Sequence, residues 1–339
     1  MAQAYMTEPG QGQDPTRAGS RAERLRNWWC PEGMWRRGIV LAVLAVLLGL
    51  LMLLHAQIPN AVGNLGSLLE TFLPWLGLAV PLLLVIAVLR RSATALIALV
   101  LPAFAWLNLF AGQITDKAGT GGNLTVATHN VNADNPDPAA TARDIVASGA
   151  DVVALEELTG DALPTYRQGL AKAYPYHTVQ GTVGLWSKRP LSGAAPVDIK
   201  MGWTRALRAT VTAADGQKFA VYVAHLPSVR VKVEAGFTAN QRDGSAEALG
   251  EAIAADPVKK VMLLGDLNGT MNDRSLAPVT SQMRSAQGAA GDGFGFSWPA
   301  AFPMARIDQI MMKGMDPVKA WVMPSTGSDH LPVAASVKI

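Results

Sequence analysis

The sequence predicts three transmembrane α-helices followed by an α/β sandwich. Three observations lead to this prediction. Half of the 339 residues are hydrophobic and only 16% are charged, whereas a soluble domain usually has about 25% charged residues. Three long apolar runs lie within the first 110 residues. From residue 123 onward, short β-rich runs alternate with helical ones, which is typical of α/β folds.

The positive charge lies in the first third of the chain. Residues 1–120 contain nine Lys or Arg and six Asp or Glu, so they carry the whole net charge of +3. Residues 121–339 contain 20 residues of each sign. That part is formally neutral and offers no bulk attraction to nucleic acid. The single cysteine, Cys30, excludes a disulfide scaffold and a cysteine-based zinc site.

The N-terminal third is expected to anchor the chain in a membrane. Residues 1–37 are polar and irregular, and we expect a disordered, basic cytoplasmic tail. Residues 38–111 form the expected membrane domain, with helices at about 38–56, 68–89 and 93–110. A buried helix of a soluble protein, or a cleavable signal peptide for the first run, are the alternatives. Three runs in close succession and a poor cleavage site favour an anchor.

The distribution of Lys and Arg predicts the orientation of this anchor. Six Arg lie in the tail, and Arg90 and Arg91 lie between the second and third runs. The loop 56–67 has no Lys or Arg, and only Lys117 follows the third run closely. The positive-inside rule therefore places the N-terminus in the cytoplasm and residues 123–339 outside the cytoplasmic membrane. Residues 112–122 are expected to form a short flexible linker.

The remainder of the chain, residues 123–339, reads as alternating strands and helices. We expect strands at 124–128, 152–155, 176–180, 183–186, 206–212, 219–224, 261–264, 307–312, 320–323 and 333–337. We expect helices at 139–148, 161–173 and 236–255. Strands in pairs with helices between them predict the sandwich.

Acids, amides and histidines stand where these apolar strands stop or start. They are Asn130, Glu156, Glu157, His225, Asp266, Asn268, Asp308, Asp329 and His330. Strand ends let a rigid sheet present several side chains to one cleft. Oxygen ligands without cysteine suit Mg²⁺, Mn²⁺ or Ca²⁺.

In this order the motifs resemble the endonuclease/exonuclease/phosphatase superfamily, which includes DNase I, apurinic endonucleases, sphingomyelinases and inositol-phosphate 5-phosphatases. The resemblance covers residues 123–339, and its most specific motifs are Gly265-Asp-Leu-Asn268, Arg306-Ile-Asp308 and Ser328-Asp-His330. It implies a DNase I-like, four-layer sandwich in which two packed β-sheets are flanked by helices. It also implies a metal-dependent hydrolase of phosphoric esters or anhydrides.

The resemblance further implies a metal site. The motif Leu155-Glu-Glu157 stands where the family has Leu-Gln-Glu, so Glu157 would bind Mg²⁺, with Mn²⁺ as an alternative. Asn130 and Asp329 would complete the site, and Asn132 is a near alternative to Asn130. A hard divalent ion would stabilise the charge that grows on the phosphoryl oxygens.

Five residues receive catalytic roles from the same resemblance. Asp266 and Asn268 would hold the phosphate and the attacking water, and His225 would donate to the phosphoryl group. Asp308 would pair with His330, fix its tautomer and favour the imidazolium. Whether Asp266 or His330 takes the proton of the water is left open by the sequence.

Substrate-binding residues are harder to choose. Arg242 and Arg205 could each meet a phosphate, although Arg205 and Arg208 could equally form a surface pair. Trp298 could line the cleft or pack in the core. Glu156, where the family usually has Gln, is expected to be turned away from the ion.

Three features favour a lipid phosphate as substrate. The domain is neutral, it is compact, and the anchor would hold its cleft near the outer leaflet. The full arrangement resembles the VanJ-type membrane proteins of actinobacteria, which are associated with teicoplanin resistance. This resemblance implies a polyprenyl (undecaprenyl) pyrophosphate or a related cell-wall lipid as substrate. The expected partners are that lipid and the bilayer, with no nucleic acid and no obligate protein partner.

Two other functions stay open at this point. One is a membrane-tethered extracellular nuclease. The other is a non-catalytic sensor or transport-associated membrane protein. The full set of expected ligands argues against a dead domain, and the lack of ionisable residues at the centre of the apolar runs argues against a transporter.

Overall fold

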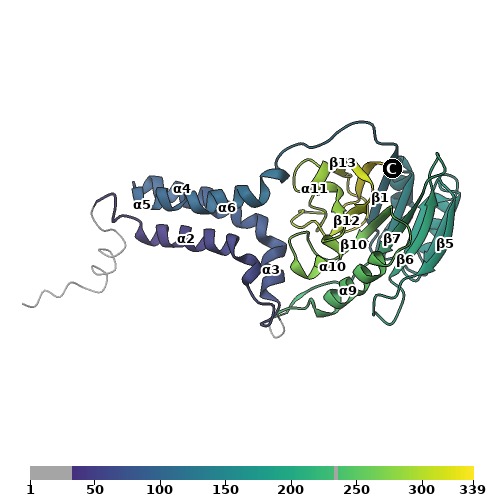
Figure 1. Ribbon diagram of the computed structural model, residues 1–339, viewed down its shortest axis with the longest axis horizontal. Coiled ribbons are helices and arrows are strands. Elements are labelled where there is room, and N and C mark those ends of the chain that lie inside the picture. The colour runs from purple at the N-terminus through teal and green to yellow at the C-terminus, as the bar shows by residue number, and fades with distance from the viewer. Residues whose placement is uncertain (1–32, 233–235) are drawn as a thin grey trace, which may run out of the picture.

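The computed structural model describes residues 33–232 and 236–339, so most of the predicted tail, residues 1–32, lies outside the described residues. An elongated helical arm projects from a rounded α/β body (Figure 1). The arm contains α2 (Ile39–Leu53), η1 (His55–Gln57), α3 (Leu65–Phe72), η2 (Leu73–Leu78), α4 (Ala79–Leu89), α5 (Ala93–Ala98), α6 (Val100–Phe110) and η3 (Ala111–Gln113).

The arm matches the predicted membrane helices only in part. Two continuous helical segments, Leu65–Leu89 and Ala93–Gln113, are long and apolar enough to cross a membrane, by length and composition alone. The first apolar helix, α2, has 15 residues. At 1.5 Å per residue it is about 22 Å long, less than the roughly 30 Å hydrocarbon core of a bilayer. The structure thus gives two candidate spans where the sequence predicted three.

The body is built on two packed β-sheets, as predicted, and each has six strands. The first has the order β13-β14-β1-β2-β4-β3 and the second β11-β12-β10-β7-β6-β5. The first contains β1 (Leu124–Asn130), β2 (Val152–Glu156), β3 (Tyr176–Gln180), β4 (Val183–Ser187), β13 (Asp316–Val322) and β14 (Val333–Lys338). The second contains β5 (Leu191–Pro196), β6 (Ala206–Thr212), β7 (Lys218–Ala224), β10 (Val261–Asp266), β11 (Arg284–Ser285) and β12 (Asp308–Lys313).

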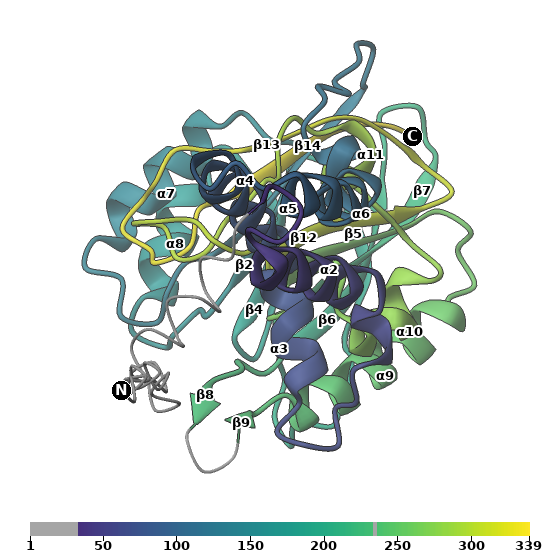
Figure 2. The ribbon, with the colours of Figure 1, turned by 90° about the vertical axis from the view of Figure 1, so that its left-hand side faces the viewer.

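Helices cover the outer faces of both sheets, one group on either side of the body (Figure 2). These helices are α7 (Pro138–Ala147), α8 (Leu163–Leu170), α9 (Asn240–Ala254) and α10 (Ala277–Thr280), with η4 (Arg274–Leu276). The short helix α11 (Ala286–Ala290) instead contacts strands of both sheets, and its Ala286 packs in the core between them. The predicted helix 236–255 begins later, because Gly236–Phe237 forms β9 and pairs with β8 (Val231–Lys232). The edge strand β5 was not predicted, since four of its six residues are Ser, Gly or Ala.

Alternation along the strands decides which side chains meet between the sheets. Val126 of β1 and Ala154 of β2 face the interior, as does Leu264 of β10. Side chains two or four residues further along a strand point to the same side. Asn130 and Asp266 therefore also point into the space between the sheets. The interior is thus apolar along its length and polar at one end.

The arm docks on the body through α3. The buried carboxylate of Glu70 accepts the backbone N–H of Arg274 at 3.0 Å and lies 2.9 Å from its guanidinium. Ser67 donates to Asp273 at 3.0 Å, and Asn64 donates to Asn240 at 3.0 Å. The start of the predicted second span, 68–89, is therefore held against protein.

The linker 112–122 also contacts the body. The backbone N–H of Lys117 donates to Gly291 O at 3.4 Å, and that of Gly119 donates to Val318 O at 2.6 Å. The segment between the arm and β1 is therefore hydrogen-bonded to the body at two residues, Lys117 and Gly119.

Replacing Arg274 with Ala should destabilise the protein by about 3 kcal/mol, because the buried carboxylate of Glu70 loses its guanidinium partner and keeps only His55 and one backbone N–H. Chemical denaturation of the full chain in detergent measures this. Arg284→Ala is the matched control, since the Arg284–Asp316 pair is 61% and 75% exposed and should contribute almost nothing. Equal losses in the two variants would show that the contact of Glu70 with Arg274 does not hold the arm.

Candidate active site

Side chains from both sheets meet at one end of the sandwich. Asn130 ends β1, Glu157 follows β2, Asp266 ends β10, Asp308 starts β12 and His330 precedes β14. Asn130 Nδ2 donates to Glu157 Oε1 at 3.1 Å and to Asp266 Oδ2 at 3.0 Å. One amide therefore joins a carboxylate of the first sheet to a carboxylate of the second.

This contact changes the expected role of Asn130. Its Oδ1 accepts the backbone N–H of Asn132 at 3.0 Å, and its NH₂ group faces the acids. In this orientation the NH₂ group of Asn130 positions Glu157 and Asp266, while its Oδ1, the atom that a metal ion would use, accepts one backbone N–H. Asn132, the alternative, lies beyond the end of β1.

Glu157 presents its carboxylate to the cleft. Its φ of 61° is left-handed, an uncommon conformation for a residue other than glycine. The turn takes Glu157 off the strand, so its side chain is 31% exposed although its neighbours are buried. The backbone N–H of Ala133 holds Glu157 Oε2 at 3.0 Å.

Asp266 is surrounded by donors. The backbone N–H of Asn268 donates to its Oδ1 at 2.8 Å, and His225 Nε2 lies 3.6 Å from its Oδ2. Burial, opposed by the charge of His330, raises the pKa of Asp266 to about 7. Asn268 Nδ2 is fixed by the carbonyl of Leu226 at 2.9 Å.

Asp308 and His330 form a close buried pair. His330 Nδ1 lies 2.9 Å and 3.1 Å from the two carboxylate oxygens of Asp308. Ser297 donates to Asp308 Oδ2 at 2.6 Å, and Ser328 accepts the backbone N–H of His330 at 3.0 Å. Burial opposes the charged form of His330, but the carboxylates of Asp308 and Asp266 raise its pKa to about 10.

These pKa values separate the two groups that the sequence left open as proton acceptors. At neutral pH His330 is an imidazolium and acts as a donor, whereas Asp266 lies near its own pKa and can accept a proton. The pKa of His225 is lowered well below its usual value by burial and by Arg205, so His225 is neutral.

Glu156 is buried between the sheets and does not line the cleft. Burial raises the pKa of Glu156 well above its usual value and so favours its protonated form. Thr128 donates to its Oε1 at 2.8 Å. A neutral carboxylic acid here is nearly isosteric with Gln, the residue usual in the family at this position.

A cleft of about 510 Å³ opens over these groups. Trp298 lines it, and Asp329 is exposed at its mouth. Further lining residues were not predicted, among them Arg230, which is exposed at the rim, and Thr71 and Phe72 of the arm. An acid within an apolar run, Glu70, was the sequence signal that this part of the arm needs a protein partner.

The two candidate arginines have different positions. Arg242 is fully buried, pairs with Asp273 at 2.7 Å and donates to the backbone of Asn268 at 3.0 Å, so it is not available to a substrate. The prediction that Arg242 contacts the substrate was wrong, because its sequence position does not reveal its ion-pair partner, Asp273, which lies 31 residues further along the chain. Arg205 contacts the ring of His225 and lies over Trp203, 5.1 Å from the ring centre.

The residues fit a divalent metal ion. Asp266, Asp308 and His330 offer ligand atoms within 4.8 Å of one another. Both oxygens of Asp308, however, are engaged by His330 and Ser297. The partly exposed carboxylate of Glu157 faces the cleft and is the side chain best placed to bind a hard ion.

The sequence of residues 127–330 matches the model of the endonuclease/exonuclease/phosphatase family. The chain belongs to this family of hydrolases. Its members typically depend on a divalent metal, in keeping with the cluster of acids described above. In a comparison with curated proteins, none matched the chain.

Solved structures share the fold of the body. A D. rerio TDP2 complexed with a single-strand DNA product has a TM-score of 0.54 and 18% identity, over 64% of this chain and 99% of that one. A Bacteroides thetaiotaomicron mannosyl-6-phosphatase has a TM-score of 0.52 and 16% identity, over 64% of this chain and 100% of that one. An endonuclease/exonuclease/phosphatase from Beutenbergia cavernae has a TM-score of 0.52 and 18% identity, over 65% and 72%. At these identities the likeness concerns the fold alone.

Glu157→Ala should abolish Mg²⁺-dependent hydrolysis without unfolding the body, because a partly exposed carboxylate contributes little to packing. Glu156→Gln is the control and should reduce activity much less, since it replaces a neutral acid with a neutral amide of similar shape. Activity assays with a Mg²⁺ titration test both variants. Similar losses at the two positions would show that Glu157 has no special role.

Asp308→Asn should lower the pKa of His330 from about 10 toward its ordinary value of 6.5, because it removes the neighbouring carboxylate. Since the folded-state pKa is raised, the pair stabilises the fold fully below pH 6.5 and this contribution is lost as pH rises through about 10. The variant should therefore show a flatter loss of stability over this range. Histidine NMR and denaturation at several pH values measure both effects.

The same pair should behave as one unit in catalysis. His330→Ala and Asp308→Asn should each reduce turnover by about 10²-fold or more. The double variant should be little worse than the worse single one. Strictly additive losses would contradict a coupled Asp308–His330 pair.

Proposed function

We propose that the chain is a membrane-anchored, Mg²⁺-dependent phosphohydrolase at the outer face of the cytoplasmic membrane. Its substrate is a lipid-linked phosphate, polyprenyl (undecaprenyl) pyrophosphate or a related cell-wall lipid. In this proposal it acts as VanJ-type proteins do and contributes to resistance against glycopeptides such as teicoplanin. The observation that carries the proposal is that Thr71 and Phe72 of the apolar arm line the same cleft as Asp266 and His330.

The surface of the arm supports the anchoring. Large apolar side chains are exposed along it, among them Val43, Leu47, Leu54, Leu82, Val85, Leu89, Ile97, Val100 and Phe104. A surface of this kind is unfavourable in water and favourable in hydrocarbon. The Lys and Arg distribution supports a cytoplasmic N-terminus and an external body.

The side chains of the cleft fit the hydrolysis of a phosphoric ester or anhydride. A divalent ion, when bound, would stabilise the charge that grows on the phosphoryl oxygens. Glu157 would hold that ion, and Asn130 would keep Glu157 next to Asp266. The imidazolium of His330 would donate to the phosphoryl group, and Asp266 would accept the proton of the attacking water. Arg230, exposed at the rim, has the charge needed to meet a second phosphate.

The formal neutrality of the body argues against a nuclease, because a nonspecific nuclease benefits from a basic groove. This consideration leaves the lipid phosphate as the better substrate. A tethered nuclease and a non-catalytic membrane protein are the outcomes that a direct assay has to separate.

The purified full chain, incubated with Mg²⁺, should release phosphate from undecaprenyl pyrophosphate and should leave plasmid DNA intact. Removal of Mg²⁺ by EDTA and the Glu157→Ala variant should both stop the release. Nicking of the plasmid without phosphate release would favour the nuclease. No reaction with either substrate would favour the non-catalytic alternative.

A further inference from the structure

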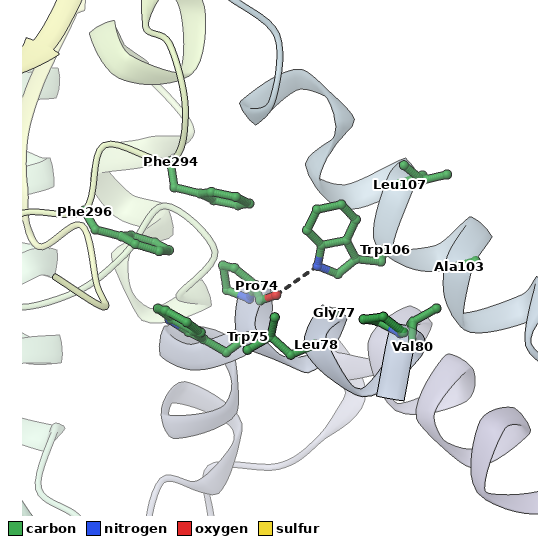
Figure 3. Close-up of a pocket in the computed structure, with 11 residues that line it drawn as sticks. Pro74, Trp75, Gly77, Leu78, Val80, Ala103, Trp106, Leu107, Phe294 and Phe296 are labelled. Atoms are coloured by element: carbon green, nitrogen blue, oxygen red, sulfur yellow. Dashed lines mark hydrogen bonds between the residues drawn. The ribbon is translucent and has the colours of Figure 1, made fainter. Parts of the chain in front are cut away.

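A second cavity lies between the arm and the body (Figure 3). It has a volume of about 460 Å³, within the usual range for ligand sites. One wall comes from η2 and the start of α4, a second from α6, and a third from Phe294 and Phe296 of the body. Both the arm and the body therefore line the cavity.

The lining offers hydrocarbon and no free polar group. Of its described lining residues, only Trp75 and Trp106 carry a polar side-chain atom. Trp75 Nε1 donates to Met304 O at 2.8 Å, and Trp106 Nε1 donates to Pro74 O at 2.9 Å. Since both indole N–H groups are already bonded within the protein, an occupant would meet only apolar surface. The chemistry of the cavity suits a hydrocarbon chain.

A row of aromatic rings lines the cavity where the arm meets the body. Trp75 and Phe296 stack with ring centres 5.6 Å apart, and Phe296 and Phe294 stack at 5.1 Å. Trp106 continues the row, 6.2 Å from Phe294. The row joins two residues of the arm to two of the body, so both parts of the chain shape the cavity.

Two segments of the chain connect this cavity to the catalytic cleft. In the arm, Phe72 lines the cleft and Pro74 lines the cavity. In the body, Trp298 lines the cleft and Phe296 lines the cavity. Two residues span at most about 7 Å of chain. The apolar cavity and the site of hydrolysis are therefore neighbours along both segments.

The cavity also borders the surface of the arm that we assign to the membrane. Leu78 and Leu107 line it and are 62% and 49% exposed. A hydrocarbon chain on that surface would thus find an apolar path that leads towards the cleft.

We propose that this cavity receives the part of the substrate's hydrocarbon chain that lies next to the phosphate. The inference rests on the proposed function, in which the substrate is a lipid-linked phosphate. A hydrocarbon chain gains little free energy when it moves from the bilayer to another apolar site. The phosphate must, however, leave the membrane surface to enter the cleft, and this would expose the adjoining chain to water. That exposure is unfavourable in proportion to the apolar area exposed. The cavity covers that part of the hydrocarbon chain and so favours substrates that have such a chain.

Filling the cavity tests the proposal. Ala103→Trp adds a large side chain to the α6 wall, and Val100→Trp adds the same side chain on the same helix outside the cavity, where Val100 is 67% exposed. Each full-length variant is assayed with undecaprenyl pyrophosphate in detergent and with inorganic pyrophosphate, a short soluble substrate without a hydrocarbon chain. Ala103→Trp should reduce kcat/KM for the long-chain substrate about 10-fold or more and change that for the short one less than about 2-fold. Val100→Trp should change neither.

The short substrate also reports on folding and on the proposed function. A variant that fails to fold loses activity on both substrates. If Ala103→Trp does so, the milder Ala103→Leu is tested instead, and it should lower kcat/KM by a smaller factor and only for the long-chain substrate. The proposed role of the cavity would be overturned if kcat/KM for the long-chain substrate were the same in Ala103→Trp, Ala103→Leu and Val100→Trp. The proposed phosphohydrolase activity would be unaffected by that result. No hydrolysis of either substrate by the unmodified protein would overturn the proposed function itself.

Discussion

The site depends on the meeting of several carboxyl groups at one end of two packed sheets, where little water reaches them. Such groups repel one another and are costly to bury as anions. The protein meets this constraint in three ways. Burial favours the protonated form of Glu156, the imidazolium of His330 lies against Asp308, and the NH₂ group of Asn130 bridges Glu157 and Asp266. Glu157 lines the cleft with its carboxylate partly exposed, which suits it to a metal ion.

The pairing of the strands brings the polar groups of the site together. Because β1 and β2 are parallel and in register from Val126 with Val152 onward, their ends bring Asn130 and Glu156 side by side. The antiparallel pairing of β10 with β12 does the same for Asp266 and Asp308. The arm then closes one side of the cleft, held there by the buried contact of Glu70 with Arg274. The apolar arm and the polar centre thereby line one cleft.

Local patterns predicted much of this arrangement. An apolar strand that stops at Asp266 or Asn130 marks a strand end, and alternation along the strand fixes the face on which the side chain lies. The fold and the approach of Asp308 to His330 follow from such patterns together with the family resemblance. What the sequence did not predict depends on contacts between distant segments. The burial of Arg242 requires Asp273, and the entry of Thr71 and Phe72 into the cleft requires the docking of α3.

We propose that Glu157 holds the metal ion while the Asp308–His330 pair stays intact beside it. Anomalous diffraction from crystals of the full chain grown with Mn²⁺ locates the ion. We expect a peak within about 2.5 Å of a carboxylate oxygen of Glu157, with His330 Nδ1 still bonded to Asp308. A peak bound by Asp308 and His330, with their hydrogen bond broken and Glu157 without a metal contact, would contradict it.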